Sequence, residues 1–316
     1  VTGFNAASFA MRGAGQTDII VYSDPQVGVA IDDFIEPQVQ TQLMDIFDIE
    51  QVEVLRGPEG TLFGKNTTAG MVTLRTKRPE LDETDVKLNV RLAEYGREEI
   101  RVAINVPVTD KIAIRASGLF AESDGYYKNG ADRVDTAAFV TTGPSAGDGR
   151  SLGGEDVFSG RFKVLYEASD NLTALFQYEI IRDNSDAVPS INESPDTFVW
   201  SSVFGLSQLS GDPLNNAGST DRDDQNLSMS LGHQVDVDGY YLNLEWKLGS
   251  GTLTSITGYR EQASLLPSTY TGTTGNFSLF DANRADNRET FQQELRYTSE
   301  LDGPFNYVTG AFYQTN

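Results

Sequence analysis

Residues 53–70, with the sequence EVLRGPEGTLFGKNTTAG, hold glycines and a lysine in an order that could surround a phosphate group. A phosphate-binding loop needs a glycine, four further residues and then Gly-Lys-Ser/Thr, so that backbone N–H groups and a hydroxyl meet the phosphates. Here Glu59 stands where the first glycine is needed, and Asn66 replaces the hydroxyl residue. The sequence NTTAGMVTLRT that follows predicts a turn and a strand, not a helix. We therefore reject a nucleotide-binding loop.

Other groups that could do chemistry are equally incomplete. Residues 143–147 fit the Gly-x-Ser-x-Gly elbow of hydrolases around Ser145, but they lie in a Gly/Ser-rich segment with no helix predicted after it. The acidic segments 221–224 and 236–239 lack the spacing of a calcium loop and read as solvated loops. His233 is the only histidine, too few for a multi-histidine metal site. We expect no enzyme activity, no resident metal and no cofactor.

The composition excludes one class of partner and favours β-structure. The chain has 46 acidic and 24 basic residues, a net charge of −22, which disfavours binding to a nucleic-acid backbone. Hydrophobic residues make up 39% of the 316 residues, and 30 Gly, 13 Tyr and 17 Phe suit many strands and turns. No cysteine is present, so no disulfide forms, which by itself says nothing about compartment.

From about Asp82 onward the chain alternates apolar and polar residues at period two. The segments that do so are 86–92, 100–108, 112–120, 158–167, 172–182, 240–248, 252–262, 290–299 and 305–313. Alternation repeated in this way predicts a sheet with one face toward an apolar medium and the other toward a polar one. No apolar run approaches the roughly 20 residues of a membrane helix. Residues 1–79 instead mix short β-like runs with one helical candidate near residues 40–47.

The predicted connections fall into two classes. PVTD, ASDN, GSG and LDGP are tight turns, whereas residues 125–156, 183–238 and 264–287 are long connections on the opposite edge, which also has one short turn at residues 95–97. Aromatic residues fall near the predicted strand ends: Tyr95, Phe120, Tyr126, Tyr127, Tyr240, Trp246 and Tyr259. Short turns on one edge, long loops on the other and an aromatic girdle are typical of an outer-membrane β-barrel.

Residues 48–79, DIEQVEVLRGPEGTLFGKNTTAGMVTLRTKRP, resemble the plug signature of TonB-dependent outer-membrane receptors. Weaker matches precede them at Met11-Arg12-Gly13 and at residues 29–33, where Asp33 stands in place of the family's usual glycine. The resemblance implies a mainly β fold: a partial α/β plug domain over residues 1–79, then the first roughly nine antiparallel strands of a transmembrane barrel over residues 80–316, out of about 22 in a complete plugged transporter. We expect a fragment, truncated at both ends and lacking the segment that TonB grasps.

The resemblance also implies roles for individual residues. Arg12 and Arg56 would pair with barrel-wall glutamates and lock the plug, with Glu53 as a local partner. Glycines would allow the tight turns of a plug folded inside a barrel: Gly57, Gly60, Gly64 and Gly70. The plug apex would face outward and contact the ligand through Gln16, Thr17, Asp18, Tyr22, Ser23 and Asp24, which could equally be ordinary turn residues.

By this resemblance the chain takes part in active uptake of a scarce nutrient across the outer membrane of a Gram-negative bacterium. A ferric siderophore is the first choice of cargo, with iron carried as the ligand complex, and cobalamin or an oligosaccharide follows. The implied partners are TonB with the inner-membrane energising complex, the ligand and outer-membrane lipid. The alternatives are a passive or structural outer-membrane barrel or adhesin, and a secreted β-rich hydrolase or lectin.

Overall fold

The structure, a computed structural model, describes residues 9–15, 25–36, 47–60, 66–129, 151–188, 221–223, 232–269 and 281–316. Its elements in these ranges are β-strands arranged in two main sheets. The helix expected near residues 40–47 falls almost entirely outside the described residues. Among those that are described, no helix is long and apolar enough to cross a membrane.

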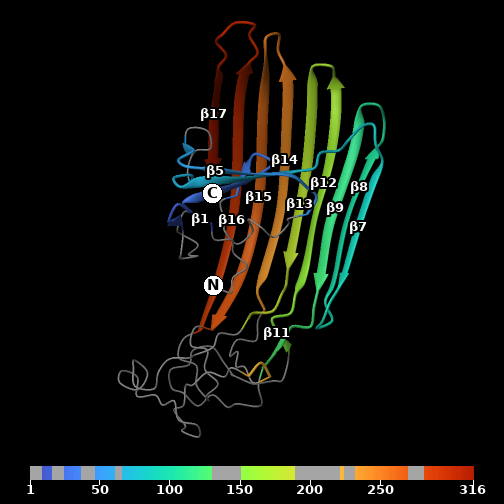
Figure 1. The fold of residues 1–316 in the computed structure, drawn as a ribbon, viewed down its shortest axis with the longest axis vertical. Coiled ribbons are helices and arrows are strands. Elements are labelled where there is room, and N and C mark those ends of the chain that lie inside the picture. Colours follow the sequence, from blue (N-terminus) through green and yellow to red (C-terminus); the bar gives the residue numbers. More distant parts are fainter. Residues whose placement is uncertain are drawn as a thin grey trace.

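The larger sheet, here called the wall, is a continuous antiparallel ladder of nine strands in the order β17-β16-β15-β14-β13-β12-β9-β8-β7. Figure 1 shows them side by side. The wall strands are β7 (Asp85–Leu92), β8 (Glu98–Pro107), β9 (Ile112–Glu122), β12 (Asp156–Ser169), β13 (Leu172–Asp183), β14 (Gln234–Lys247), β15 (Gly251–Thr269), β16 (Asp281–Ser299) and β17 (Val308–Thr315).

The nine predicted strands are confirmed, but several are longer than their alternation suggested. β14 begins at Gln234, β15 runs on to Thr269 and β16 begins at Asp281, so strand pairing takes over parts of the expected loops. A further hairpin, β10 (Tyr127–Lys128) with β11 (Ser151–Leu152), lies within the connection from β9 to β12. The added part of β16 is polar on both faces, and at the start of β14 the apolar residues Val235 and Val237 are buried on the inner face, so an apolar-outward alternation misses these ends.

The two faces of the wall differ in polarity. Convex-face side chains include many exposed apolar residues: Val86, Leu88, Val90, Ile100, Ile104, Phe158, Phe162, Tyr166, Phe176, Tyr240, Leu242, Trp246 and Leu295. The concave face carries buried polar and charged side chains: Asn105, Arg115, Arg161, Lys163, Gln177, Glu179, Arg260, Gln262 and Gln292. Apolar outside and polar inside is the arrangement of a transmembrane β-barrel.

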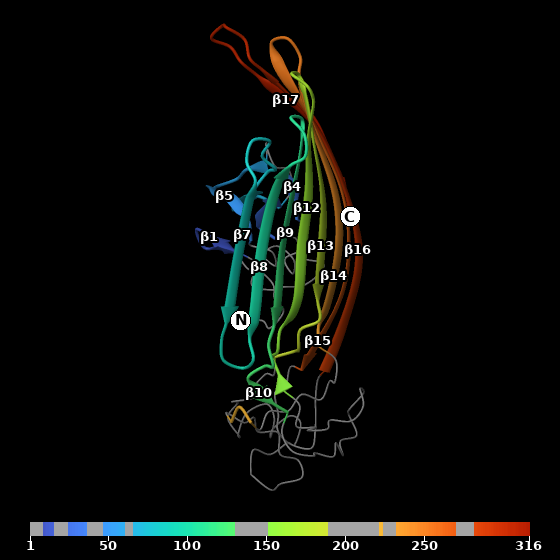
Figure 2. The same cartoon turned by 90° about the vertical axis from the view of Figure 1, so that its right-hand side faces the viewer.

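The smaller sheet, the plug, has the order β4-β3-β6-β5 and mixes parallel and antiparallel pairs. Its strands are β3 (Val27–Ile31), β4 (Phe34–Ile35), β5 (Ile49–Arg56) and β6 (Gly70–Thr76), with a separate hairpin of β1 (Ala10–Met11) and β2 (Ala14–Gly15) beside them. A core of Val27, Val29, Val72 and Leu74 holds β3 to β6. The plug lies against the concave face of the wall, in the half nearer to the short turns (Figure 2).

A two-residue turn joins β3 to β4, and both of its residues have left-handed backbones, with φ of 50° at Asp32 and 69° at Asp33. This is the geometry in which glycine is preferred at the second position. Aspartate is among the few other residues that adopt it at modest cost. Asp33, which stands where the family usually has glycine, therefore adopts the left-handed backbone that this turn requires.

Candidate functional site: the plug–wall interface

One row of cross-strand partners, running across the concave face of the wall, contacts the plug. It consists of the inward-facing residues Asn105, Arg115, Lys163, Gln177, Tyr241, Gly258, Gln292 and Gln314, which are successive cross-strand partners from β8 to β17. We call it the plug-contact row. Seven of its members touch the plug or the segment after it, as described below, and Gln177 lines a cavity beside it.

The first contact is a buried bidentate ion pair between Arg115 on β9 and Asp48, the residue before β5. Arg115 donates from Nε to Asp48 Oδ2 at 2.6 Å and from Nη2 to Oδ1 at 2.5 Å. The side chains are only 2% and 4% exposed. Removing one partner of such a pair costs about 3–5 kcal/mol, because the other charge stays buried.

The second contact joins Lys163 on β12 to the turn of the β3–β4 hairpin. Lys163 Nζ lies 3.1 Å from Asp32 Oδ2 and donates to the Thr76 carbonyl at 3.3 Å. Thr76 in turn donates to Asp32 from its backbone N, at 2.8 Å, and from its hydroxyl. Burial by itself would raise the pKa of Asp32, but Lys163, Arg161 and the Thr76 hydrogen bonds hold it below its usual value.

The third contact places Glu36, just after β4, on Arg260 of β15. Arg260 Nη1 lies 3.1 Å from Glu36, and its Nε lies 3.4 Å from Glu179 on β13, so two carboxylates share one guanidinium. Tyr241 donates to Glu179 at 2.8 Å. Burial raises the pKa of Glu36 to about 7, with Glu179 adding to the rise and the cations Arg260 and Arg161 opposing it.

The tip of the hairpin is held by uncharged groups. The Phe34 ring packs edge-on against Tyr241, with centroids 5.0 Å apart, and covers Gly258 so closely that any side chain there would overlap it. Gln292 accepts from Ile35 N and donates to the Asp33 carbonyl, both at 2.9 Å, which imitates the pairing of another strand. Gln314 Nε2 reaches the Ile35 carbonyl at 3.4 Å.

The chain that leaves the plug is held by Asn105, which is 1% exposed. Asn105 donates to the carbonyls of Glu80 and Glu83 and accepts from Glu80 N. The segment from plug to wall therefore lies against β8. Just before this segment, Arg78 pairs with Glu245 on β14 at 2.7 Å. Both side chains are about two-fifths exposed, so this ion pair contributes little to the stability of plug docking.

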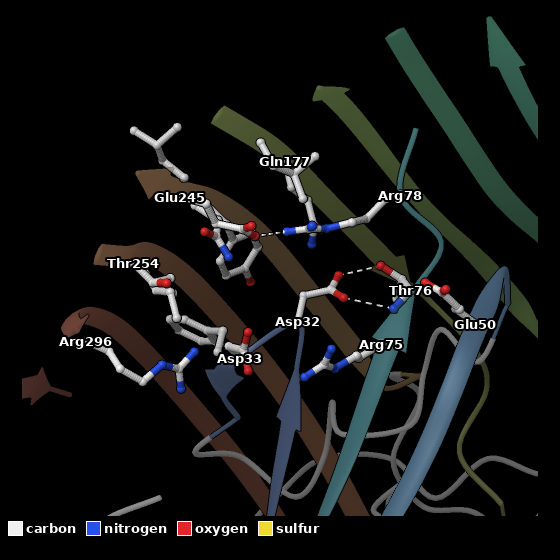
Figure 3. A pocket seen from close by; sticks show the side chains of 16 residues that line it. Asp32, Asp33, Glu50, Arg75, Thr76, Arg78, Gln177, Glu245, Thr254 and Arg296 are labelled. Carbon is white, nitrogen blue, oxygen red and sulfur yellow. Dashed lines mark hydrogen bonds and ion pairs between the residues drawn. The ribbon is translucent and has the colours of Figure 1, made fainter. Parts of the chain in front are cut away.

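A cavity of 370 Å³ lies between the plug and β13–β16, toward the short-turn end of the wall. Figure 3 shows charges of both signs converging on it, with Arg75, Arg78 and Arg296 facing Asp33 and Glu245. Because the cations and carboxylates are mixed, this cavity has no single charge preference. Among the described residues no three His, Cys, Asp or Glu side chains gather as a metal-binding group.

The ligand residues expected at the plug apex, Gln16 to Asp24, lie outside the described residues. Arg12 sits at the turn of β1–β2 and Arg56 ends β5, and both are exposed. Within the described ranges neither has an ion pair with a wall glutamate, and Glu53 accepts instead from Gln51 at 2.7 Å and Thr73 at 3.4 Å. Locking by these three residues stays a prediction. The locks seen here have the opposite polarity, with plug carboxylates on wall cations.

At two of the four plug glycines the structure shows why a residue with a side chain would not fit. Gly57 has φ of +130°, which other residues rarely adopt. Gly70 is an ordinary strand residue, but a Cβ there would overlap Met11 Sδ and lie 2.5 Å from the Leu55 carbonyl oxygen. Gly60 shows neither constraint, and Gly64 lies outside the described residues.

The other candidates from the sequence have structural explanations. His233 Nε2 lies 2.9 Å from Asp183, which also accepts from Ser185 N at 3.0 Å. The interpretation of residues 236–239 as a solvated loop was wrong, because they belong to β14, where Asp238 accepts from Arg182 and Tyr178 at 2.6 Å. Ser145 lies outside the described residues.

Sequence reasoning did not single out Arg115, Lys163, Glu36, Arg260 and Gln292. A usable signal existed, since Arg115, Lys163 and Arg260 are charged residues on the polar face of amphipathic strands. Buried charges there demand partners. Their partners are far away in sequence, however, so only the register could pair them.

Comparison with known proteins agrees with this architecture. The family model of the TonB-dependent receptor plug domain matches residues 2–71. The pesticin receptors of Yersinia enterocolitica and Yersinia pestis are 35% identical over 75 residues, which is 23% of this chain and 10% of theirs.

Solved structures match nearly the whole chain. The ferric yersiniabactin uptake receptor FyuA of Yersinia pestis has a TM-score of 0.64 at 18% identity, covering 98% of this chain and 42% of that one. The siderophore receptor PiuA of Acinetobacter baumannii has a TM-score of 0.64 at 15% identity, covering 92% and 39%. This chain thus spans about two-fifths of these structures. Residues 2–71 therefore match the plug domain of TonB-dependent receptors, and the chain shares its fold with these solved receptors.

Proposed function

We propose that this chain contributes the plug and part of the barrel wall of an outer-membrane receptor that takes up a ferric siderophore, with energy delivered through TonB. The observation that carries the proposal is a plug domain held on the lumen face of an amphipathic sheet by three ion pairs, through Asp32, Glu36 and Asp48. Such a plug closes a path that must be reopened. The siderophore receptors among the structural relatives favour iron over cobalamin or an oligosaccharide as cargo.

A band on the convex face supports the membrane setting. One outward register row is aromatic across β12 to β16: Phe162, Tyr178, Tyr240, Tyr259 and Phe291. A second level carries Trp246 and Tyr297. The two levels are six residues apart along β14, or roughly 20 Å at about 3.4 Å per residue. Outer-membrane barrels have an apolar band of about 25 Å between aromatic girdles.

No step of the proposed function is covalent. The ligand would bind at the outer loops and plug apex, and force applied through TonB would rearrange the plug.

The test is growth of a deletion strain under iron limitation, with single ferric siderophores as iron sources. The strain is expected to lose growth on one of them, and a plasmid copy should restore it only in cells with intact TonB. Growth on every iron source with loss on one glycan would overturn the siderophore assignment. Restored uptake in cells without TonB would instead favour the passive barrel.

A further inference from the structure

On the face of the wall that the plug covers, cationic side chains outnumber the carboxylates of the wall itself. From β9 to β15, the plug-contact row and the neighbouring row toward the long loops carry four cations, Arg115, Lys163, Arg161 and Arg260. The only carboxylate of the wall in these two rows is Glu179, which leaves the wall a net charge of +3. The plug supplies counter-charge with the carboxylates of Asp32 and Asp48, and with Glu36 in its ionised form.

These four cations are well shielded in the closed state. The side chains of Arg115, Lys163 and Arg260 are 2%, 2% and 3% exposed, and Arg161 as a residue is 4% exposed. Cross-strand pairing makes the group continuous, since Arg115 is the partner of Lys163 and Arg161 is the partner of Glu179. The group therefore forms one strip on the lumen face.

We propose that this strip is a transit site for an anionic cargo, and that the plug carboxylates occupy it while the receptor is closed. The proposal rests on the proposed function. When the plug leaves, the strip loses its counter-charge in a partly enclosed lumen, where charges interact more strongly than in open water. A cargo bearing carboxylate or catecholate oxygens replaces the lost partners. Arginine suits such groups because it donates to paired oxygens. A cationic cargo would meet repulsion at the same place.

The electrostatic potential of the strip can be measured with one introduced cysteine, whose reaction rate with charged reagents depends on that potential. The chain contains no other cysteine that would react. Ser159 faces the lumen from β12, two residues from Arg161, and is 0% exposed. Its hydroxyl has no hydrogen-bond partner among the described atoms, so Ser159→Cys should be well tolerated. The probes are two methanethiosulfonate reagents of similar size, one a sulfonate anion and one a quaternary ammonium cation. Ser250→Cys, in the exposed β14–β15 turn, corrects for their intrinsic reactivity.

Labelling is measured on the full receptor in energised and de-energised cells supplied with ferric siderophores. We expect Ser159→Cys to react only in energised cells, and the anionic reagent to react roughly tenfold faster than the cationic one after correction. In a background with Arg115→Gln and Asp48→Asn, which keeps a hydrogen-bonded pair but removes one wall cation, the preference should fall several-fold. Asparagine tolerates the left-handed backbone at position 48, where φ is 58°.

The outcomes separate the two ideas. Labelling without charge preference, or a preference that survives the Arg115→Gln/Asp48→Asn exchange unchanged, overturns the transit site and leaves the proposed uptake function standing. A thiol at position 159 that never reacts, or reacts equally without energy, removes the energised opening of the plug and the transit site with it.

Discussion

Replacing Gly258 with alanine should unseat the plug hairpin. A Cβ at this position would overlap Phe34 Cδ2 and lie 2.7 Å from Cε2, and the Phe34 side chain is buried at 1% exposure. The ring has little room to retreat, because Tyr241 packs against it and Gln292 holds the backbone on both sides of it. Overpacking of this kind costs about 1–3 kcal/mol.

The assay is amide hydrogen exchange of residues 27–36 in the purified full protein. A loss of about 1–3 kcal/mol speeds exchange through local opening by roughly 5- to 140-fold, at about 1.4 kcal/mol per tenfold. Gly118→Ala is the matched control, since the nearest atom to a Cβ there is 3.6 Å away, an ordinary contact. Phe34→Leu should partly relieve the clash, so the double variant should cost less than the sum of the single changes. Wild-type exchange in Gly258→Ala, or strictly additive costs, would refute the packing argument.

Three further changes test the polar contacts. Arg115→Gln should destabilise plug docking by about 3–5 kcal/mol by denaturant titration, and adding Asp48→Asn should recover most of it; no recovery would mean that the charge was not the cause. Docking should weaken as pH rises from 4.5 to about 7, because burial raises the pKa of Glu36 over that window and the docked state therefore holds its proton more tightly. Hydrogen exchange against pH checks this, and Glu36→Gln should flatten the profile. Asp33→Gly should stabilise the hairpin by up to about 1 kcal/mol in thermal unfolding, since φ there is 69°; destabilisation would argue that the Asp33 side chain has a role of its own.

Much of the fold follows from local sequence patterns. Period two predicts which side chains of residues 112–120 share a face, because successive residues of a strand point to opposite sides. The glycine-rich stretch around Gly57 and Gly70 led us to expect tight turns; the structure shows a positive φ at Gly57, whereas Gly70 lies in β6, where a Cβ would overlap its neighbours. Strand ends were less predictable, since β15 and β16 continue past the apolar layer where the pattern fades.

The candidate site was far less predictable. The family resemblance implied plug arginines on wall glutamates, whereas the described contacts set Asp48 and Asp32 on Arg115 and Lys163. Alternation assigns a charged residue to the inner face but says nothing about its height along the barrel. Height depends on the register between strands, which is set by turns and pairing across the sheet.

The sequence by itself therefore determined the plug signature, the amphipathic strands and the polarity of each face, because these depend on neighbouring residues. The tertiary structure decided which polar side chains meet the plug. Glu36 and Arg260 are more than two hundred residues apart, and their pairing exists only because β15 and the plug hairpin are brought together by the fold. Burial makes this pairing important for stability, since a charged group removed from water must have a partner of opposite charge or become neutral.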